Sequence, residues 1–161
     1  MVTGNRNDKD KYSEVRAVFI TYDTSIPIER IAIEIKTYSG VYQLATEDVE
    51  VTWSVAKDNL NTGNSSEWHT PSRKEMFLIL QHIEEINLIL ENLENNGDGE
   101  RIIGNYWTYD ESMSGESRKI YTFSIEKLEK SEMSSYTGYD ITLRQSYSMG
   151  TNKLRLIRRV E

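Results

Sequence analysis

The stretch SRKEMFLILQHIEEINLILENL, residues 72–93, decides the fold of this chain. Its apolar residues recur every three or four positions, which is the pattern of an amphipathic α-helix with one face in a core. Ser72 and Glu75 have the spacing of a capping box, in which each side chain accepts a hydrogen bond from the other residue's backbone amide. We therefore predict a helix that begins after Ser72 and ends in the turn-forming residues 95–99. A bend near residues 84–85 is compatible with the pattern.

Strand patterns lie on the N-terminal side of this helix. Apolar and polar residues alternate over residues 14–21 and again over 30–46, where residues 38–40 form the turn of a hairpin. A helix over residues 28–36 is the alternative, because Glu and Lys favour helices. The alternating isoleucines of that segment favour a strand, which is therefore our prediction.

The chain between this hairpin and the central helix is predicted to hold a short strand over residues 49–53 and a short helix over 53–60. Beyond the central helix the pattern is again that of strands. We predict them over residues 102–109, 119–125, 139–147 and 153–160. Strands around one helical block indicate an α+β fold.

Composition excludes several classes of protein. The chain has 161 residues, 37% of them apolar, which suffices for one globular domain, assigned to residues 14–161 after a polar leader, residues 1–13. Its formal net charge of −7 disfavours generic binding to nucleic acid or anionic lipid. The sequence contains no apolar window long enough to insert into a membrane, and the leader lacks the pattern of a signal peptide. The absence of cysteine excludes disulfides and cysteine nucleophiles.

Short pieces of sequence occur in a characteristic order. They are TWSVA at 52–56, WHTPSRKEM at 68–76, YWT at 106–108 and the closing KLRLIRR at 153–159. In this order they resemble the Fibrobacter succinogenes major paralogous domain family, which is similar in fold to C-type lectins and to formylglycine-generating enzymes. The resemblance covers residues 47–160 and leaves 14–46 as an N-terminal β extension.

The resemblance implies a C-type-lectin-like fold, with two helices packed on short antiparallel sheets and the chain ends paired together. It also implies structural roles for a set of motif residues, namely Trp53, Trp68, Pro71, Ser72, Glu75, Trp107, Arg155 and Arg158. The alternation of bases with apolar residues in 153–160 independently favours a half-buried strand over a nucleic-acid surface.

The chain departs from this pattern in ways that bear on chemistry. His69 and Thr70 replace an arginine and a leucine of the family, and the copper-binding cysteines of formylglycine-generating enzymes have no counterpart. The sugar-binding motifs of calcium-dependent lectins are also missing. We therefore expect no cofactor, no metal and no enzymatic activity. Calcium binding near residues 92–100 stays a minor alternative, because this segment holds carboxylates and glycines but fails the calcium-loop template.

The two histidines are the remaining candidates for catalysis. We expect His82 to be a surface or half-buried helix residue and His69 to be a structural turn residue just before the central helix. A hydrolase that uses His69 as its base is a third hypothesis for function. The chain lacks the Gly-x-Ser-x-Gly motif that would support a triad.

Loops within residues 105–152 are the predicted ligand-binding surface. Their aromatic, amide and carboxylate side chains suit a sugar, because aromatic faces pack on C–H groups and carboxylates accept hydrogen bonds from hydroxyls. We expect Trp107 to be buried. The candidate ligand-binding residues are Tyr109, Asp110, Glu111, Tyr136, Tyr139, Tyr147 and Asn152.

The resemblance then predicts a non-catalytic recognition domain of a secreted or cell-surface bacterial protein, which binds a carbohydrate or a protein. Its location outside the cell or on the outer membrane, for instance as a lipoprotein adhesin, is implied by the resemblance alone. The alternative is a structural or assembly module of a surface appendage, such as a fimbrial component, whose edge strands near residues 14–46 pair with other subunits.

Overall fold

The computed structural model describes residues 13–21, 29–60, 64–109, 120–129, 138–146 and 150–160. The first part of the predicted leader, residues 1–12, lies outside this description. The strands are β1 (Glu14–Thr21), β2 (Glu29–Thr37), β3 (Gly40–Ala45), β4 (Val49–Thr52), β5 (Gly104–Trp107), β6 (Ile120–Lys127), β7 (Tyr139–Ser146), β8 (Thr151–Leu154) and β9 (Ile157–Arg159). The helical elements are η1 (Val55–Asn59), a π-helix, and the α-helices α2 (Arg73–Gln81) and α3 (Ile83–Asn95).

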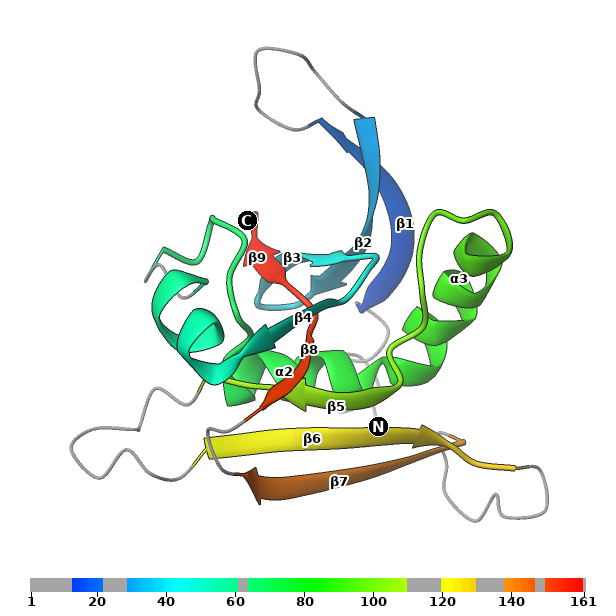
Figure 1. Cartoon of the computed structure of the whole chain (residues 1–161). Coiled ribbons are helices and arrows are strands. Elements are labelled where there is room, and N and C mark those ends of the chain that lie inside the picture. Colours follow the sequence, from blue (N-terminus) through cyan, green and yellow to red (C-terminus); the bar gives the residue numbers. More distant parts are fainter. Residues whose placement is uncertain are drawn as a thin grey trace, which may run out of the picture.

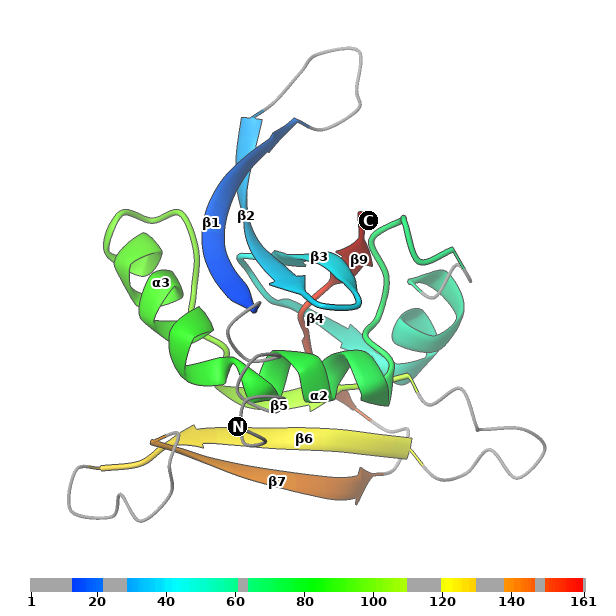
Figure 2. The same cartoon turned by 180° about the vertical axis from the view of Figure 1, so that it is seen from behind.

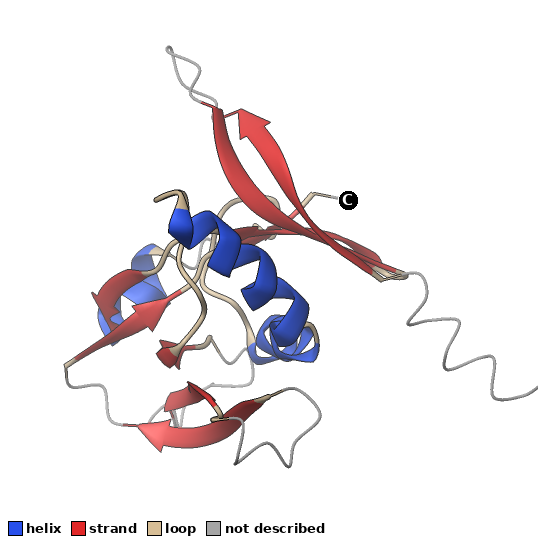
Figure 3. Ribbon diagram, turned by 90° about the vertical axis from the view of Figure 1, so that its right-hand side faces the viewer, coloured by secondary structure: helices blue, strands red, loops and turns tan. Residues whose placement is uncertain are grey.

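Two sheets enclose the two α-helices. Sheet A has the strand order β1-β2-β3-β9 and is antiparallel, whereas sheet B has the order β4-β8-β5-β6-β7, in which only the β5–β8 pair is parallel. Helices α2 and α3 lie between sheet A and the β5-β6-β7 part of sheet B (Figures 1 and 3). The half of the β1–β2 pair that ends at Thr21 and Glu29 extends beyond the helices (Figure 2). The prediction of an α+β fold is confirmed.

The alternation of residues along sheet A decides which of its faces meets the helices. Ile33, Leu44 and Ile157 stand side by side across β2, β3 and β9, and all three are fully buried in the main core. On the opposite face the adjacent positions carry polar pairs, such as Arg16 with Glu34, whose side chains are 2.7 Å apart. The predicted hairpin is thus confirmed, and the helix alternative for residues 28–36 is wrong.

The buried apolar side chains form two separate hydrophobic cores. The main core joins sheet A, both α-helices and the inner face of β5-β6-β7, where Tyr106, Phe123 and Ile125 are buried. A smaller core lies beside η1, where the Trp53 and Trp107 rings pack with their centroids 5.4 Å apart. Trp107 is fully buried, as predicted, and its indole N–H donates to the Val51 carbonyl at 2.7 Å. In the described part of the chain, no helix is long and apolar enough to cross a membrane.

The predicted capping box is present at the start of α2. The Ser72 hydroxyl accepts from the Glu75 amide at 3.1 Å, and the Glu75 carboxylate accepts from the Ser72 amide at 3.0 Å. These bonds satisfy backbone donors that the first helical turn leaves without a partner. The helix start is therefore set locally, by residues three apart in the sequence.

The predicted single helix is instead two helices, and the break lies at His82 rather than near residues 84–85. The His82 side chain donates from Nδ1 to the Leu78 carbonyl, the acceptor that its own backbone amide would use in a continuous helix. That amide turns to the Ile79 carbonyl at 3.0 Å. His82 is buried in the corner between the helices, so its expected place as a surface or half-buried residue is corrected.

The predicted strand over residues 153–160 also divides into two. Strand β8 belongs to sheet B and β9 to sheet A, so the chain passes from one sheet to the other at Arg155 and Leu156. The chain makes the reverse passage between β3 and β4, at residues 46–48. The two passages lie side by side, because the Ala45 amide donates to the Leu156 carbonyl at 2.9 Å.

A buried ion pair joins these two passages. The Arg155 guanidinium, which is fully buried, donates from Nε to Asp48 Oδ1 at 2.8 Å. The other Asp48 oxygen accepts from the Tyr106 hydroxyl at 2.9 Å. Further Arg155 bonds go to the carbonyls of Ala45, at 3.2 Å, and Glu100, at 2.8 Å. Burial raises the pKa of Asp48, although the Arg155 charge and these hydrogen bonds favour its ionised form.

Substitution of Asp48 by Ala should lower the free energy of unfolding by about 3–5 kcal/mol, because it leaves a buried guanidinium without its counter-charge. Urea unfolding followed by circular dichroism measures this change. The matched control is Glu94→Ala, which removes the exposed ion pair with Arg101 and should leave stability nearly unchanged. Equal effects of the two substitutions would contradict the assigned role of Asp48.

Candidate functional site

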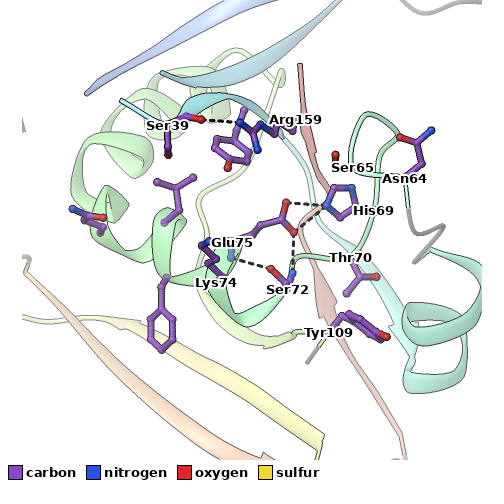
Figure 4. A pocket seen from close by; sticks show the side chains of 14 residues that line it. Ser39, Asn64, Ser65, His69, Thr70, Ser72, Lys74, Glu75, Tyr109 and Arg159 are labelled. Atoms are coloured by element: carbon purple, nitrogen blue, oxygen red, sulfur yellow. Dashed lines mark hydrogen bonds and ion pairs between the residues drawn. The ribbon is translucent and has the colours of Figure 1, made fainter. Parts of the chain in front are cut away.

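A pocket of about 450 Å³ opens between sheet A and the start of α2. Its lining comes from the β2–β3 hairpin, the segment that leads into α2, α2 itself, Tyr109 and the last strand (Figure 4). This volume lies within the range of about 300–1,000 Å³ that is typical of small-molecule sites. These segments are distant in the sequence, so only the tertiary fold assembles the pocket.

The wall from sheet A consists of Tyr42 and Arg159. These residues are direct partners in the β3–β9 register, and therefore their side chains leave the same face of the sheet. The Arg159 guanidinium lies over the Tyr42 ring, 5.7 Å from its centroid. Its Nη2 donates to the Ser39 carbonyl at 2.7 Å. The hairpin turn thus holds a cation beside an aromatic face at the pocket.

His69 and Glu75 form a further wall of the pocket. The His69 backbone is held against β9 by hydrogen bonds in both directions with Ile157, at 2.9 and 3.1 Å. Its Nε2 lies 2.9 Å from each of the Glu75 carboxylate oxygens. The capping box holds that carboxylate in turn, so the same glutamate caps the helix and orients the imidazole (Figure 4).

Both nitrogens of His69 are engaged. Nδ1 lies 2.6 Å from the Glu67 carbonyl, which accepts hydrogen bonds only, and Nε2 faces the Glu75 carboxylate. A ring that faces two acceptors donates at both nitrogens, as an imidazolium does. A general base needs a free lone pair on nitrogen, and neither ring nitrogen offers one here. The geometry does not support the hypothesis of a hydrolase with His69 as its base.

Two opposing effects set the charge state of Glu75. Burial alone would raise its pKa, but the hydrogen bonds from His69 and Ser72 and the His69 charge outweigh burial, so the pKa of Glu75 is lowered. The carboxylate is therefore ionised at neutral pH. The pair is an internal salt bridge within the pocket wall.

Tyr109 reaches the pocket from the end of β5. Its amide donates to the Pro71 carbonyl at 2.7 Å, and its carbonyl accepts from the Arg73 amide at 3.1 Å. These bonds hold the segment after β5 against the start of α2, in a parallel bridge between Ser72 and Tyr109. The buried Pro71 and the half-buried Ser72 thus position a predicted ligand-binding residue at the pocket.

The three predicted ligand-binding residues that the structure describes do not form one surface. Tyr109 lines the pocket, whereas Tyr139 lies in β7 with its side chain in the main core, which corrects its expected place on a binding loop. Asn152 is half-buried in β8 opposite Val51 and does not line the pocket. The remaining candidates, Asp110, Glu111, Tyr136 and Tyr147, lie outside the described residues.

The other motif residues with described contacts pack or pair within the protein. Trp68 is half-buried, and the Arg158 guanidinium stacks over the Trp68 ring, 4.7 Å from its centroid. The Nε of Arg158 also donates to Gln43 Oε1 at 2.8 Å. Arg155 belongs to the buried ion pair with Asp48. The placement of the bases in the last strands therefore agrees with the structural interpretation of their alternation.

Two of the three carboxylates in residues 92–100, Glu94 and Glu100, take part in hydrogen bonds within the protein. Glu94 pairs with Arg101 at 3.2 Å, and Glu100 accepts from the Asp48 amide at 2.7 Å. Gly97 has a φ of 77°, which suits the turn after α3. Across the described ranges, no cluster of three or more His, Asp or Glu side chains is placed to hold a metal ion.

Sequence reasoning missed most of this pocket. Tyr42 belongs to none of the motif pieces, and Arg159 closes the piece 153–159 only as a residue of a predicted strand. The available signal was the segment from Trp68 to Glu75, whose family resemblance marks a structural helix start and not a ligand site. Contacts between distant segments left no local pattern in the sequence.

Substitution of Glu75 by Gln should reduce the loss of stability in acid. Because the folded-state pKa of Glu75 lies below its ordinary value of 4.5, its ionisation stabilises the fold above that pH, and this contribution is lost as pH falls through the folded-state pKa. The variant should therefore be less stable than the parent at pH 7 and approach it at low pH. Urea unfolding across pH measures this, with the exposed Glu126→Gln as control. A constant difference between variant and parent at every pH would contradict the prediction.

Comparison with known proteins finds no family model that matches this chain, and no curated protein and no solved structure matches it significantly. Functional inference therefore rests on the geometry described above.

Proposed function

We propose that this chain is a non-catalytic recognition domain of a secreted or cell-surface bacterial protein. Its ligand, a carbohydrate or a segment of a protein, binds in the pocket between sheet A and α2. The observation that carries this proposal is the composition of the pocket, whose lining combines the aromatic residues Tyr42, Tyr109 and Phe77 with polar residues from separate segments. Concave sites that combine aromatic faces with a few fixed polar groups are typical of small-ligand recognition.

The absence of a catalytic role belongs to the same proposal. The most polar part of the lining, His69 with Glu75, is a salt bridge whose groups are already engaged with each other and with the backbone. Such a pair supplies a rigid, preorganised wall, and it lowers the cost of ordering the site when a ligand binds. It offers neither an activated nucleophile nor a free base.

A C-type-lectin-like arrangement is the finer fold assignment that we propose. In its support, two helical segments lie between an early hairpin and a set of later strands, and β9 pairs with β3 near the other end of the chain. The capped start of α2 and the packed pair Trp53 and Trp107 are consistent with the structural roles that we propose for these motif residues. The proposed location outside the cell rests on that resemblance.

An assembly module is the second candidate, and the edge of sheet A favours it. Strand β1 is the last strand of sheet A on its side, so among the described strands only β2 pairs with it. Phe19 stands in the extending half of this strand with 77% of its surface exposed. An open edge strand with an exposed aromatic residue is a template for β-strand addition by another subunit.

The recognition proposal predicts that Tyr42→Ala and Tyr109→Ala each weaken ligand binding by about ten-fold or more, because each removes an aromatic face from the pocket. Binding is measured on a glycan array and against bacterial and host surface extracts. Phe19→Ser is the matched control, since it removes an exposed aromatic residue far along the β1–β2 hairpin. Binding that survives both tyrosine substitutions would place the ligand elsewhere.

The assembly alternative predicts a mass above that of a monomer in light scattering coupled to size exclusion. Phe19→Lys should then shift the mass towards the monomer, because it places a charge on the edge that pairs. Lys36→Gln, an exposed change on the neighbouring strand, should leave the mass unchanged. A strict monomer at every concentration would argue against this alternative.

A further inference from the structure

We propose that the ligand of this pocket is an acidic sugar, recognised through its carboxylate. This inference rests on the proposed recognition function and narrows its ligand. It follows from the charge of the pocket lining, from the engagement of Glu75 with His69 and Ser72 (Figure 4), and from the Tyr42 ring beside Arg159.

The charges that line the pocket have the opposite sign to the protein as a whole. The chain has a formal net charge of −7, yet the charged groups among the described residues that line the pocket are Lys74, Arg159 and the imidazolium of His69 against one carboxylate, Glu75. Lys74 is exposed on α2 and makes no ion pair within the described residues. An acidic protein that gathers cations around one concave site creates a local potential that attracts anions.

The carboxylate of Glu75 is paired with His69 and therefore does not neutralise the charge of Lys74. Its Oε1 accepts from the Ser72 amide at 3.0 Å and lies 2.9 Å from His69, and its Oε2 is also 2.9 Å from His69. The His69 charge balances it at contact distance. Lys74 therefore supplies positive charge toward a ligand, and Arg159 adds a guanidinium that is held beside the Tyr42 ring.

The neighbouring rings favour a sugar over a simple anion. Arg159 lies over the Tyr42 ring. Phe77, which is 51% exposed, also lines the pocket, while its ring packs edge-on with Phe123 of β6 at a centroid distance of 5.6 Å. Aromatic faces of this kind pack against the C–H groups of a sugar ring, and guanidinium and ammonium groups pair with its carboxylate. The side chains of Asn64, Ser65 and Gln81 add groups that can exchange hydrogen bonds with hydroxyls.

The first experiment compares matched probes on the whole chain. Uronate-bearing and sialate-bearing glycans are arrayed beside their methyl esters, which keep the ring and remove the charge. The expected result is binding of at least one acidic glycan that exceeds binding of its ester by about ten-fold, equivalent to ~1.4 kcal/mol. Added salt should weaken this binding, because it screens exposed charges.

The second experiment substitutes a cation of the pocket. Lys74→Gln should weaken binding of the acidic glycan about five- to ten-fold, which is typical for loss of a charge-assisted hydrogen bond at a partly exposed site. Binding of the ester should not change. Lys36→Gln, an exposed lysine of sheet A outside the pocket, is the matched control, and thermal unfolding verifies that both variants are folded.

The outcomes separate this inference from the proposed function. If acidic and esterified glycans bind equally and Tyr42→Ala abolishes both, the pocket binds sugars and the acidic-sugar inference is overturned. If a peptide with a free C-terminal carboxylate binds better than its amide and no glycan binds, recognition stands but the sugar class is overturned. If no probe or extract binds in a manner that depends on Tyr42, both proposals fail.

Discussion

The ion pair between Asp48 and Arg155 is the constraint on which the rest of the structure depends. The chain crosses between the two sheets twice, and this pair joins the two crossing points at 2.8 Å. Desolvation of two charges costs several kcal/mol, so such a pair provides a unique relative position more than a large net gain in free energy. The rigid fork of the guanidinium adds hydrogen bonds to the carbonyls of Ala45 and Glu100, which fix the strands on either side.

The pocket follows from this crossing. Once the chain has passed Arg155, β9 runs beside β3 and brings Arg159 against Tyr42, while Ile157 pairs with His69. His69 then meets Glu75, which the capping box already holds at the start of α2. The buried ion pair and the pocket therefore both depend on one short segment near the end of the chain, residues 155–159.

Local features were predicted well, and the errors arose where a side chain competed with the backbone or where packing decided its environment. The capping box, the alternating strands of sheet A and the burial of Trp107 agree with the sequence pattern. The helix was predicted as continuous because its apolar stripe is continuous, but the His82 side chain takes the carbonyl that continuity requires. The segment around Tyr139 has the composition of a recognition loop. Tyr139 nevertheless packs in the core, because β7 pairs with β6.

The sequence by itself determined the alternating strands of sheet A, the capped start of α2 and the absence of cysteine chemistry. Periodicity and capping act between residues that are close along the chain, which is why they can be predicted. Only the tertiary structure decided that residues 153–160 divide between two sheets and that Tyr42, His69, Tyr109 and Arg159 surround one pocket. The physical reason is that a contact between distant segments depends on strand order and on the path of each crossing. A strand pattern specifies which face is apolar, but not which strand it will lie beside.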